Sequence, residues 1–312
     1  MSRTFPPPTR AHIGPAFRDW VMLAALGVIW GGSFLAVELA ITDVGPLSLA
    51  AARILLGAAG LWVVARVLGY GLPRLRGPKG PRIWAHAFGF ALFSNAIPFT
   101  LLSWGQQQVS SGFAGITMAV VPLLVLPLSH LLIPGERLTA RKAAGFAIGF
   151  IGVIVLIGPA EILAGEGPWQ ARLACIGAAA CYAIGSIITR LCPDVPLVSY
   201  AALGLTLAAL VLTPVAVGVE GVPQMPSPTA LGAIVYLGML PTALATLMLV
   251  MLIQRAGPPF LSLVNYQVPV WAVLFGMVVL GESLPGQFAV ALACMLAGLA
   301  VSQARAWRVR PG

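Results

Sequence analysis

Long apolar stretches alternate along the chain with short segments rich in glycine, proline and charge. A helix that crosses the hydrocarbon core of a bilayer, about 30 Å thick, needs about 20 mostly apolar residues. The segments between the stretches, such as 69–82 and 223–228, carry the residues that interrupt helices. We therefore predict an all-α membrane protein with ten transmembrane helices, at residues 20–41, 47–68, 83–104, 112–133, 142–158, 171–191, 198–218, 230–253, 260–280 and 287–304.

Composition supports lipid as the solvent of this chain. Of the 312 residues, 59% are hydrophobic and 9% are charged, against roughly a quarter charged in soluble domains. The net charge of +9 does not indicate nucleic acid, because the basic residues gather at the ends of the apolar stretches. The cysteines lack metal-binding spacing, so we expect no metal and no cofactor. They are Cys175, Cys181, Cys192 and Cys294.

The basic residues also predict the orientation. With ten spans, every Lys and Arg except Arg53 and Arg172 falls on one side of the membrane. Because cytoplasmic loops carry an excess of basic residues, both termini are predicted to be cytoplasmic, with tails at 1–19 and 305–312. Arg is much preferred over Lys in Ala- and Gly-rich spans, which indicates a GC-rich bacterial genome and hence an inner (plasma) membrane.

Landmarks of the first half recur in the second. Residues 134–138 read PGERL and residues 280–284 read LGESL, an offset of 146 residues. Other landmarks repeat at similar offsets: Pro98 with Pro241, and Pro122 with Pro269. We therefore predict two five-helix repeats, 20–158 and 171–304.

Because five is an odd number, the second repeat enters the bilayer with the opposite orientation. Inverted repeats are a recurring design of secondary transporters, in which two similar halves exchange conformations around a central cavity. Gene duplication in a protein with another task is the alternative.

Prolines and polar groups inside the spans indicate where a substrate would bind. Each mid-span proline frees a backbone carbonyl, and matching interruptions in both halves point to the substrate site. The aromatic residues near them have an alternative role in an interfacial belt or in packing. The predicted cavity residues are Pro98, Pro122, Pro241 and Pro269, with Asn95, Thr100, Trp104, Thr242, Asn265, Tyr266, Gln267 and Trp271, and with Ser103 and Thr246 nearby.

Two ionisable residues, Glu38 and Arg53, lie within spans on either side of a short turn. The first interpretation is a structural ion pair between two antiparallel helices. The second is that they face the cavity, where Arg53 attracts a substrate carboxylate and Glu38 attracts an amino group or a proton.

Small residues predict close helix packing. Gly145 and Gly149 form a GxxxG pattern, and Gly152 follows three residues later. The pattern predicts either contact between the fifth and tenth spans or a dimer face, with packing inside one chain as the default.

Several motifs resemble one known family, the EamA branch of the drug/metabolite transporter superfamily. They are WGGSF at 30–34, Pro46 with AAR at 51–53, VP at 121–122, GERL at 135–138, ACYA at 180–183 and GE at 281–282. The resemblance covers residues 20 to 304 and is greatest to the amino-acid exporter group, including exporters of aromatic amino acids. It implies a ten-helix carrier around a central cavity. Glu38 departs from the pattern, because many members carry a basic or neutral residue there.

Together these features predict a secondary transporter that moves small organic molecules by alternating access, an exporter of amino acids, aromatic amino acids included, or of other metabolites. No GxxxxGK[ST] segment is present to bind ATP, and the spans carry no convergent catalytic set, so we do not expect an enzyme. Export of drugs or other metabolites, a channel and an intramembrane enzyme are the alternatives. The substrate, the direction of transport, a role for protons in coupling and the oligomeric state stay open.

Overall fold

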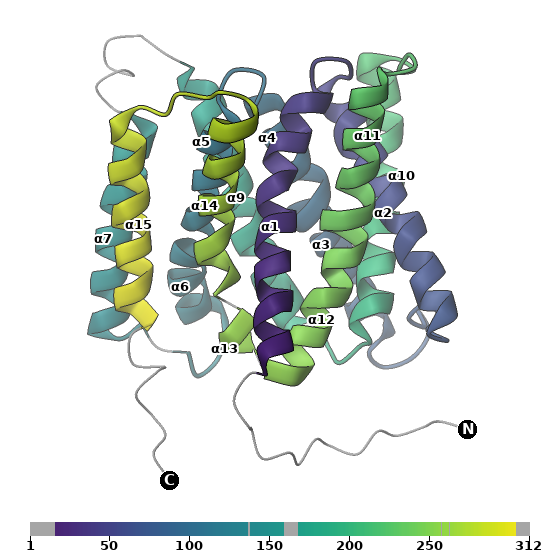
Figure 1. Cartoon of the computed structure of the whole chain (residues 1–312). Helices are drawn as coiled ribbons and strands as arrows, with labels where there is room; N and C mark the ends of the chain where they lie inside the picture. Colours follow the sequence, from purple (N-terminus) through teal and green to yellow (C-terminus); the bar gives the residue numbers. More distant parts are fainter. Residues whose placement is uncertain (1–15, 137, 159–167, 257, 262, 304–312) are drawn as a thin grey trace.

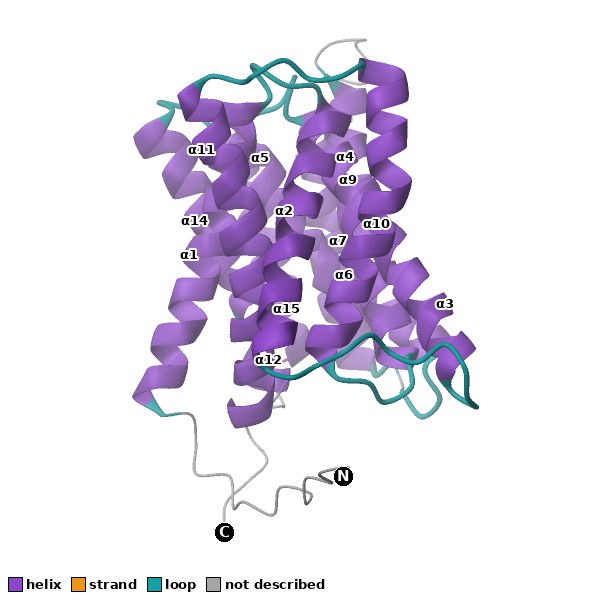
Figure 2. Cartoon of the chain, turned by 90° about the vertical axis from the view of Figure 1, so that its right-hand side faces the viewer, coloured by secondary structure: helices purple, strands orange, loops and turns teal. Residues whose placement is uncertain are grey.

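The computed structural model describes residues 16–136, 138–158, 168–256, 258–261 and 263–303, and in these ranges it contains helices and loops but no strands. The helices run side by side, and the loops gather at the two ends of the bundle (Figures 1 and 2). The predicted tail at 1–19 is shortened by a helix that begins at Phe17, while residues 1–15 and the predicted tail 305–312 lie outside the described residues.

The bounds of the helices follow the proline and glycine punctuation of the sequence. In chain order they are α1 (Phe17–Ala40), α2 (Pro46–Val67), α3 (Gly80–Ala91), η1 (Leu92–Ala96), α4 (Ile97–Gly105), α5 (Ser111–Ile116), η2 (Thr117–Ala119), α6 (Val120–Leu132), α7 (Ala140–Ile157), α9 (Trp169–Leu191), α10 (Leu197–Glu220), α11 (Pro228–Leu237), η3 (Gly238–Leu244), α12 (Ala245–Ala256), α13 (Pro258–Leu261), α14 (Val264–Val279) and α15 (Gly286–Gln303).

Eight helical stretches among the described residues are long and apolar enough to cross a membrane, and they match the first eight predicted spans. The last two apolar helices, Val264–Val279 and Gly286–Ser302, are shorter. The ninth predicted span, 260–280, is divided into α13 and α14. The all-helical membrane fold is thus confirmed, while the length criterion is met by eight of the ten predicted spans.

The outward faces of the bundle are apolar. Large hydrophobic side chains such as Val63 on α2, Ile151 on α7, Leu210 on α10 and Val278 on α14 are more than half exposed. Exposed apolar surface on several helices marks contact with an apolar environment. Lipid is that environment for helices of this length and composition.

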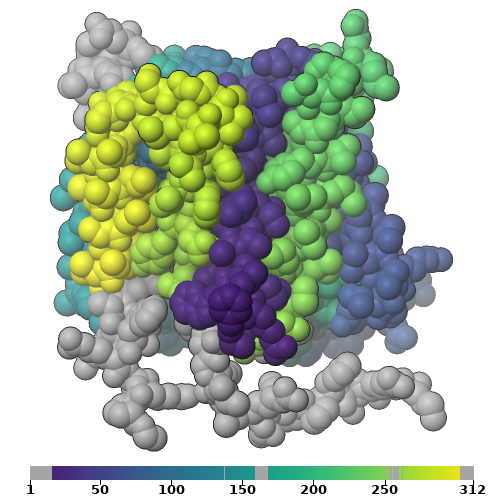
Figure 3. All heavy atoms as spheres, in the orientation of Figure 1, coloured from purple at the N-terminus to yellow at the C-terminus, as the bar shows by residue number. Residues whose placement is uncertain are grey.

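Helices from the two halves of the chain interleave. α1 lies between α14 on one side and α11 with α12 on the other (Figures 1 and 3). α9 packs in the same way between α6 and the pair α3 and α4, and α2 packs along α10. The two halves therefore share their interior and form one body.

α7 and α15 pair through small residues. Gly298 on α15 lies so close to α7 that an added Cβ would overlap the carbonyl oxygen of Gly145 and the backbone of Gly149. Gly152 approaches Ala291 and Met295 of α15 in the same way. The GxxxG pattern thus packs the fifth predicted span onto the tenth within one chain, and the dimer-face alternative is wrong for these glycines.

Replacing Gly298 with alanine should destabilise the fold. The new Cβ has no room between α7 and α15, and such overpacking costs about 1–3 kcal/mol. Gly232→Ala on α11 is the matched control, because nothing lies within 4 Å of a Cβ there and alanine favours helix by up to about 1 kcal/mol. Unfolding of both variants in mixed detergent micelles measures the difference. Equal stability of the two variants would contradict the close α7–α15 contact.

Candidate substrate site

Two π-helical turns interrupt the bundle, and both occur where the sequence predicts breaks. η1 immediately precedes Pro98, which lies in the first turn of α4, and η3 contains Pro241. Proline has no N–H for the regular helical ladder, and a π-turn is one way to accommodate the missing bond. The breaks fall in α3–η1–α4 and α11–η3–α12, the third and eighth predicted spans.

Polar side chains satisfy carbonyls next to both breaks. Asn95 Nδ2 donates to the Phe90 carbonyl at 3.1 Å, and the Thr242 hydroxyl donates to the Leu237 carbonyl at 2.8 Å, each reaching back five residues. One turn later, two further hydroxyls reach back four residues: Thr100 to Ala96 and Thr246 to Thr242. The donors of these predicted cavity residues are therefore engaged within their own helices.

The WGGSF segment of α1 fits against the second break. Trp30 Nε1 donates to the Pro241 carbonyl at 3.1 Å. The Tyr236 hydroxyl of α11 donates to the Ile29 carbonyl at 2.9 Å, and it lies where a Cβ on Gly32 would stand. These bonds join α1 to the break in η3, and the Tyr236 hydroxyl explains why the segment needs a residue without a side chain at position 32, two residues after its tryptophan.

α14 brings another group of predicted residues against α1. Gln267 packs on Gly27, and the Trp271 side chain packs on Gly31. The Trp271 ring stacks on Phe275, with centroids 5.9 Å apart. The remaining predicted residues of α14 lie on the same helix, with Pro269 buried and with Asn265 and Tyr266 half-buried.

Two predicted residues lie elsewhere. Trp104 stands at the end of α4 and is 38% exposed, which agrees with the alternative of an interfacial belt. Pro122 is half-buried near the start of α6. Neither makes a polar contact with the residues around η1 and η3 described above.

Arg53 lies at the centre of the candidate site. It is only 6% exposed, and its guanidinium carbon stands 3.7 Å from the ring centroid of Phe99 on α4. Its Nε has no hydrogen-bond partner, and no described group accepts a hydrogen bond from the guanidinium. The Tyr182 ring of α9 packs against Phe99, with centroids 6.4 Å apart. Arg53 is thus a buried cation among aromatic rings without an anionic partner.

The backbone of Arg53 faces the other break. Its carbonyl oxygen lies 3.2 Å from the position of a Cβ on Gly238, the first residue of η3. Arg53 therefore lies between the two breaks. Its backbone packs against η3, and its side chain packs against α4, the helix that follows η1. Phe99 and Tyr182 were not predicted, because nothing in the local sequence shows that they lie beside Arg53.

Glu38 and Arg53 do not form the ion pair that was the first interpretation. Gln106 Nε2 donates to Glu38 at 3.4 Å and to the Phe34 carbonyl at 2.9 Å, so Glu38 faces the residues that follow α4. Arg53 faces Phe99, and no ion pair joins the two among the described residues. The hairpin places the two side chains toward different neighbours, so the ion-pair interpretation is wrong.

The described residues contain no group of three or more His, Cys, Asp and Glu side chains that could hold a metal ion. The groups described around η1 and η3 are a cation, aromatic rings and backbone carbonyls. Such a set binds and orients a small molecule through charge, hydrogen bonds and apolar contact.

Apolar helices long enough to span a membrane, a helix break in each half of the chain and an unpartnered buried cation are together the features of a membrane transport protein. The sequence profile of the EamA-like transporter family matches residues 19–158 and again residues 169–303. The chain belongs to this family, a branch of the drug/metabolite transporter superfamily.

Two curated relatives match over most of the chain. One, from Escherichia coli strain K12, is named "Uncharacterized inner membrane transporter YedA" and is 30% identical over 84% of this chain and 83% of its own. The other, from Streptantibioticus cattleyicolor, is named "Probable terminal-alkyne amino-acid exporter" and is 26% identical over 90% of this chain and 91% of its own. A solved crystal structure with 26% identity superposes with a TM-score of 0.65 over 94% of this chain and 99% of that chain.

Removing the hydroxyl that bonds across the second break should cost stability. Thr242→Val keeps the shape of the side chain but loses the bond to the Leu237 carbonyl, a loss of about 0.5–1 kcal/mol. Thr213→Val is the matched control, because the Thr213 hydroxyl is buried without a partner. We expect unfolding to become easier for Thr242→Val and not for Thr213→Val. The reverse order would show that the Thr242 bond does not support η3.

Proposed function

We propose that this protein is a secondary transporter that moves small organic molecules bearing a carboxylate, amino acids first among them, out of the cell by alternating access. The observation that carries the proposal is Arg53, a buried cation without an anionic partner between the two helix breaks. A charged side chain inside a span is costly unless it is paired or lines a polar pathway. A substrate carboxylate is the partner that the site lacks.

The neighbours of Arg53 suggest the rest of the substrate. A guanidinium binds a carboxylate through two parallel charge-assisted hydrogen bonds. Phe99 and Tyr182, whose rings pack together beside Arg53, offer an apolar wall for a side chain. This arrangement suits an amino acid with an apolar or aromatic side chain. The amino-acid exporter named among the relatives points the same way, and the export of other metabolites or drugs is the alternative.

We further propose that the ten apolar helices form two inverted repeats, 20–158 and 171–304, around a central cavity. Several paired features support this architecture. The breaks η1 and η3 carry equivalent side-chain bonds 147 residues apart, from Asn95 and from Thr242. Three main neighbours of α1, which are α11, α12 and α14, correspond to three main neighbours of α9, which are α3, α4 and α6.

The turns that end the repeated segments support the same arrangement. Gly135 and Gly281, the glycines of the PGERL and LGESL segments, both have positive φ, at 87° and 66°. The family profile also matches the chain in two successive stretches. On this arrangement the distribution of basic residues favours both termini in the cytoplasm, and the inner-membrane relative supports the inner membrane as the location.

Arg53→Met should strongly reduce saturable flux of carboxylate substrates. Liposomes that contain the purified protein would be loaded with radiolabelled aromatic or neutral aliphatic amino acids, and the flux would be measured. We expect the flux at low substrate concentration to fall at least about tenfold, because the substrate carboxylate loses its charged partner. Arg53→Lys should retain part of the flux, since lysine keeps the positive charge but lacks the two parallel N–H donors of the planar guanidinium. Arg66→Met is the matched control, because Arg66 is exposed at the end of the same helix.

Normal flux in Arg53→Met would remove the carboxylate-binding role. Absence of flux for every amino acid in the parent protein, shown to be folded by its unfolding profile, would move the search to other metabolites or drugs. Current that does not saturate with substrate concentration would favour a channel.

Glu38 is the proposed proton carrier. It is a half-buried acid at the end of α1, it accepts a hydrogen bond from Gln106, and it lies within electrostatic range of Glu282. We expect Glu38→Gln, which cannot exchange a proton, to remove the effect of an imposed proton gradient on flux while it leaves exchange between labelled and unlabelled substrate in place. Unchanged acceleration by the gradient in Glu38→Gln would exclude this role.

A further inference from the structure

Three carboxylates connect the two halves of the chain by hydrogen bonds at one end of the bundle. This end, opposite the start of α1 and the finish of α15, is called the far end here (Figure 1). Each carboxylate accepts backbone N–H groups at the start of a helix in the other half. The bonds are Ser227 N to Asp43 at 2.8 Å, Leu47 N and Ser48 N to Glu220 at 3.0 and 2.9 Å, and Ser111 N and Gly112 N to Glu282 at 2.7 and 3.0 Å.

These bonds are favourable for a common reason. The first N–H groups of a helix have no partner in the helix itself, and the helix dipole makes this end attractive to a negative charge. At Asp43, which lies in the loop after α1, hydrogen bonds from the Ser227 hydroxyl and then from its backbone N–H hold the pKa below its ordinary value. The carboxylates at the far end therefore act as caps that span the two halves.

Glu282 is the most enclosed of the three. Its carboxylate occupies the space beside Gly276 on α14, where any Cβ would overlap it, and it lies 3.1 Å from the position of a Cβ on Gly112. Through α5 it holds the start of the fourth predicted span against α14, where Gly115 meets Ala272 in close contact. The contact between α5 and α14 closes the space between these helices at the far end.

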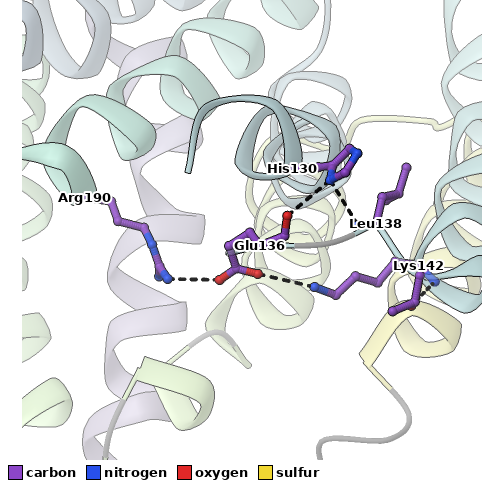
Figure 4. A network of polar contacts seen from close by, with 6 residues as sticks. His130, Glu136, Leu138, Lys142 and Arg190 are labelled. Atoms are coloured by element: carbon purple, nitrogen blue, oxygen red, sulfur yellow. Dashed lines mark hydrogen bonds and ion pairs between the residues drawn. The ribbon is translucent and has the colours of Figure 1, made fainter. Parts of the chain in front are cut away.

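Among the residues that the structure describes, the corresponding glutamate at the opposite end makes a different kind of contact. Glu136, which lies 146 residues before Glu282, forms ion pairs instead with Arg190 at 3.0 Å and Lys142 at 3.6 Å (Figure 4). His130 stands 146 residues before Gly276, and its ring accepts the Leu138 N–H at 3.3 Å. The position that corresponds to Gly276 is thus a histidine, whereas Gly276 itself leaves room for the Glu282 carboxylate at the far end.

The sequence also explains why this contact forms at one end. The residues 147 positions after Ser111 and Gly112 are Pro258 and Pro259, which begin α13. Proline has no N–H to donate. A glutamate at the opposite end therefore lacks the two backbone donors that correspond to those Glu282 uses at the far end.

We propose that Glu282 is the latch of a gate at the far end: it holds the pathway shut there by capping the helix that starts at Ser111, and its release is required before substrate leaves at that end. The transport step rests on the proposed function, but the latch itself is a property of the fold. Because the prolines at the opposite end cannot donate the hydrogen bonds that Glu282 accepts, the conformation closed at the far end is the more stable one.

The test measures opening directly, through a cysteine placed at the latch. Ser111 is fully buried, and its hydroxyl has no hydrogen-bond partner, so Ser111→Cys loses no bond. The variant would be reconstituted in lipid nanodiscs, which expose both ends, and the rate of maleimide labelling at position 111 would be followed by peptide mass spectrometry. The parent protein, with its four native cysteines, supplies the background.

We expect slow labelling when Glu282 is intact and at least a tenfold faster rate in the Ser111→Cys, Glu282→Gln double variant, because the amide offers one acceptor and no charge. Gly276→Ala should also speed labelling, since its Cβ displaces the carboxylate without changing its charge. Glu136→Gln is the matched control at the opposite end and should not speed labelling at position 111.

Rapid labelling with Glu282 intact would overturn the proposal, as would a rate that neither Glu282→Gln nor Gly276→Ala raises. An equal rise in Glu136→Gln would overturn it too, because the effect would then be a general loosening. The readout needs no substrate, so a failure to find amino-acid flux leaves it unaffected. If flux is found, Glu282→Gln should alter its rate while substrate competition stays in the same order.

Discussion

Every backbone N–H and C=O group inside a bilayer must find its partner within the protein, because the hydrocarbon offers none. This requirement makes the described chain helical throughout its apolar stretches, and it makes each proline inside a span a problem to be solved locally. At Pro98 and Pro241 the solution is a π-turn with a side chain that bonds five residues back. The breaks are costly to build, and each half of the chain contains one of them.

The breaks also create the place where polar chemistry gathers. Trp30 bonds to the carbonyl of Pro241, and Arg53 lies between η3 and the helix that follows η1. Irregular backbone at membrane depth is stable where protein or water satisfies it, so a break and a binding site are natural neighbours. Arg53 adds the element that the backbone cannot supply, a full charge that its protein neighbours leave unpaired.

Close packing around the site depends on residues without side chains. Gly31 admits Trp271, Gly32 admits Tyr236, and Gly276 admits the Glu282 carboxylate. Helices in lipid gain little from the hydrophobic effect when they associate, so close approach and hydrogen bonds hold them together. The same property allows movement, because a gate that is closed by a few hydrogen bonds between helix ends can open without exposing a large apolar core.

The sequence by itself determined the helical membrane fold, the places of the first eight apolar helices and the breaks near Pro98 and at Pro241, because hydropathy and proline chemistry act over a few residues. Pro269, which was also predicted to interrupt a helix, lies inside α14. It also identified the glycines that pack α7 on α15. Only the tertiary structure decided what Arg53, Glu38 and Glu282 contact. Arg53 lies on Phe99, Glu38 turns to Gln106 instead of Arg53, and Glu282 caps a helix 171 residues earlier in the chain. Partners of this kind are set by how distant helices dock and by where a glycine leaves room, and no local pattern contains that information.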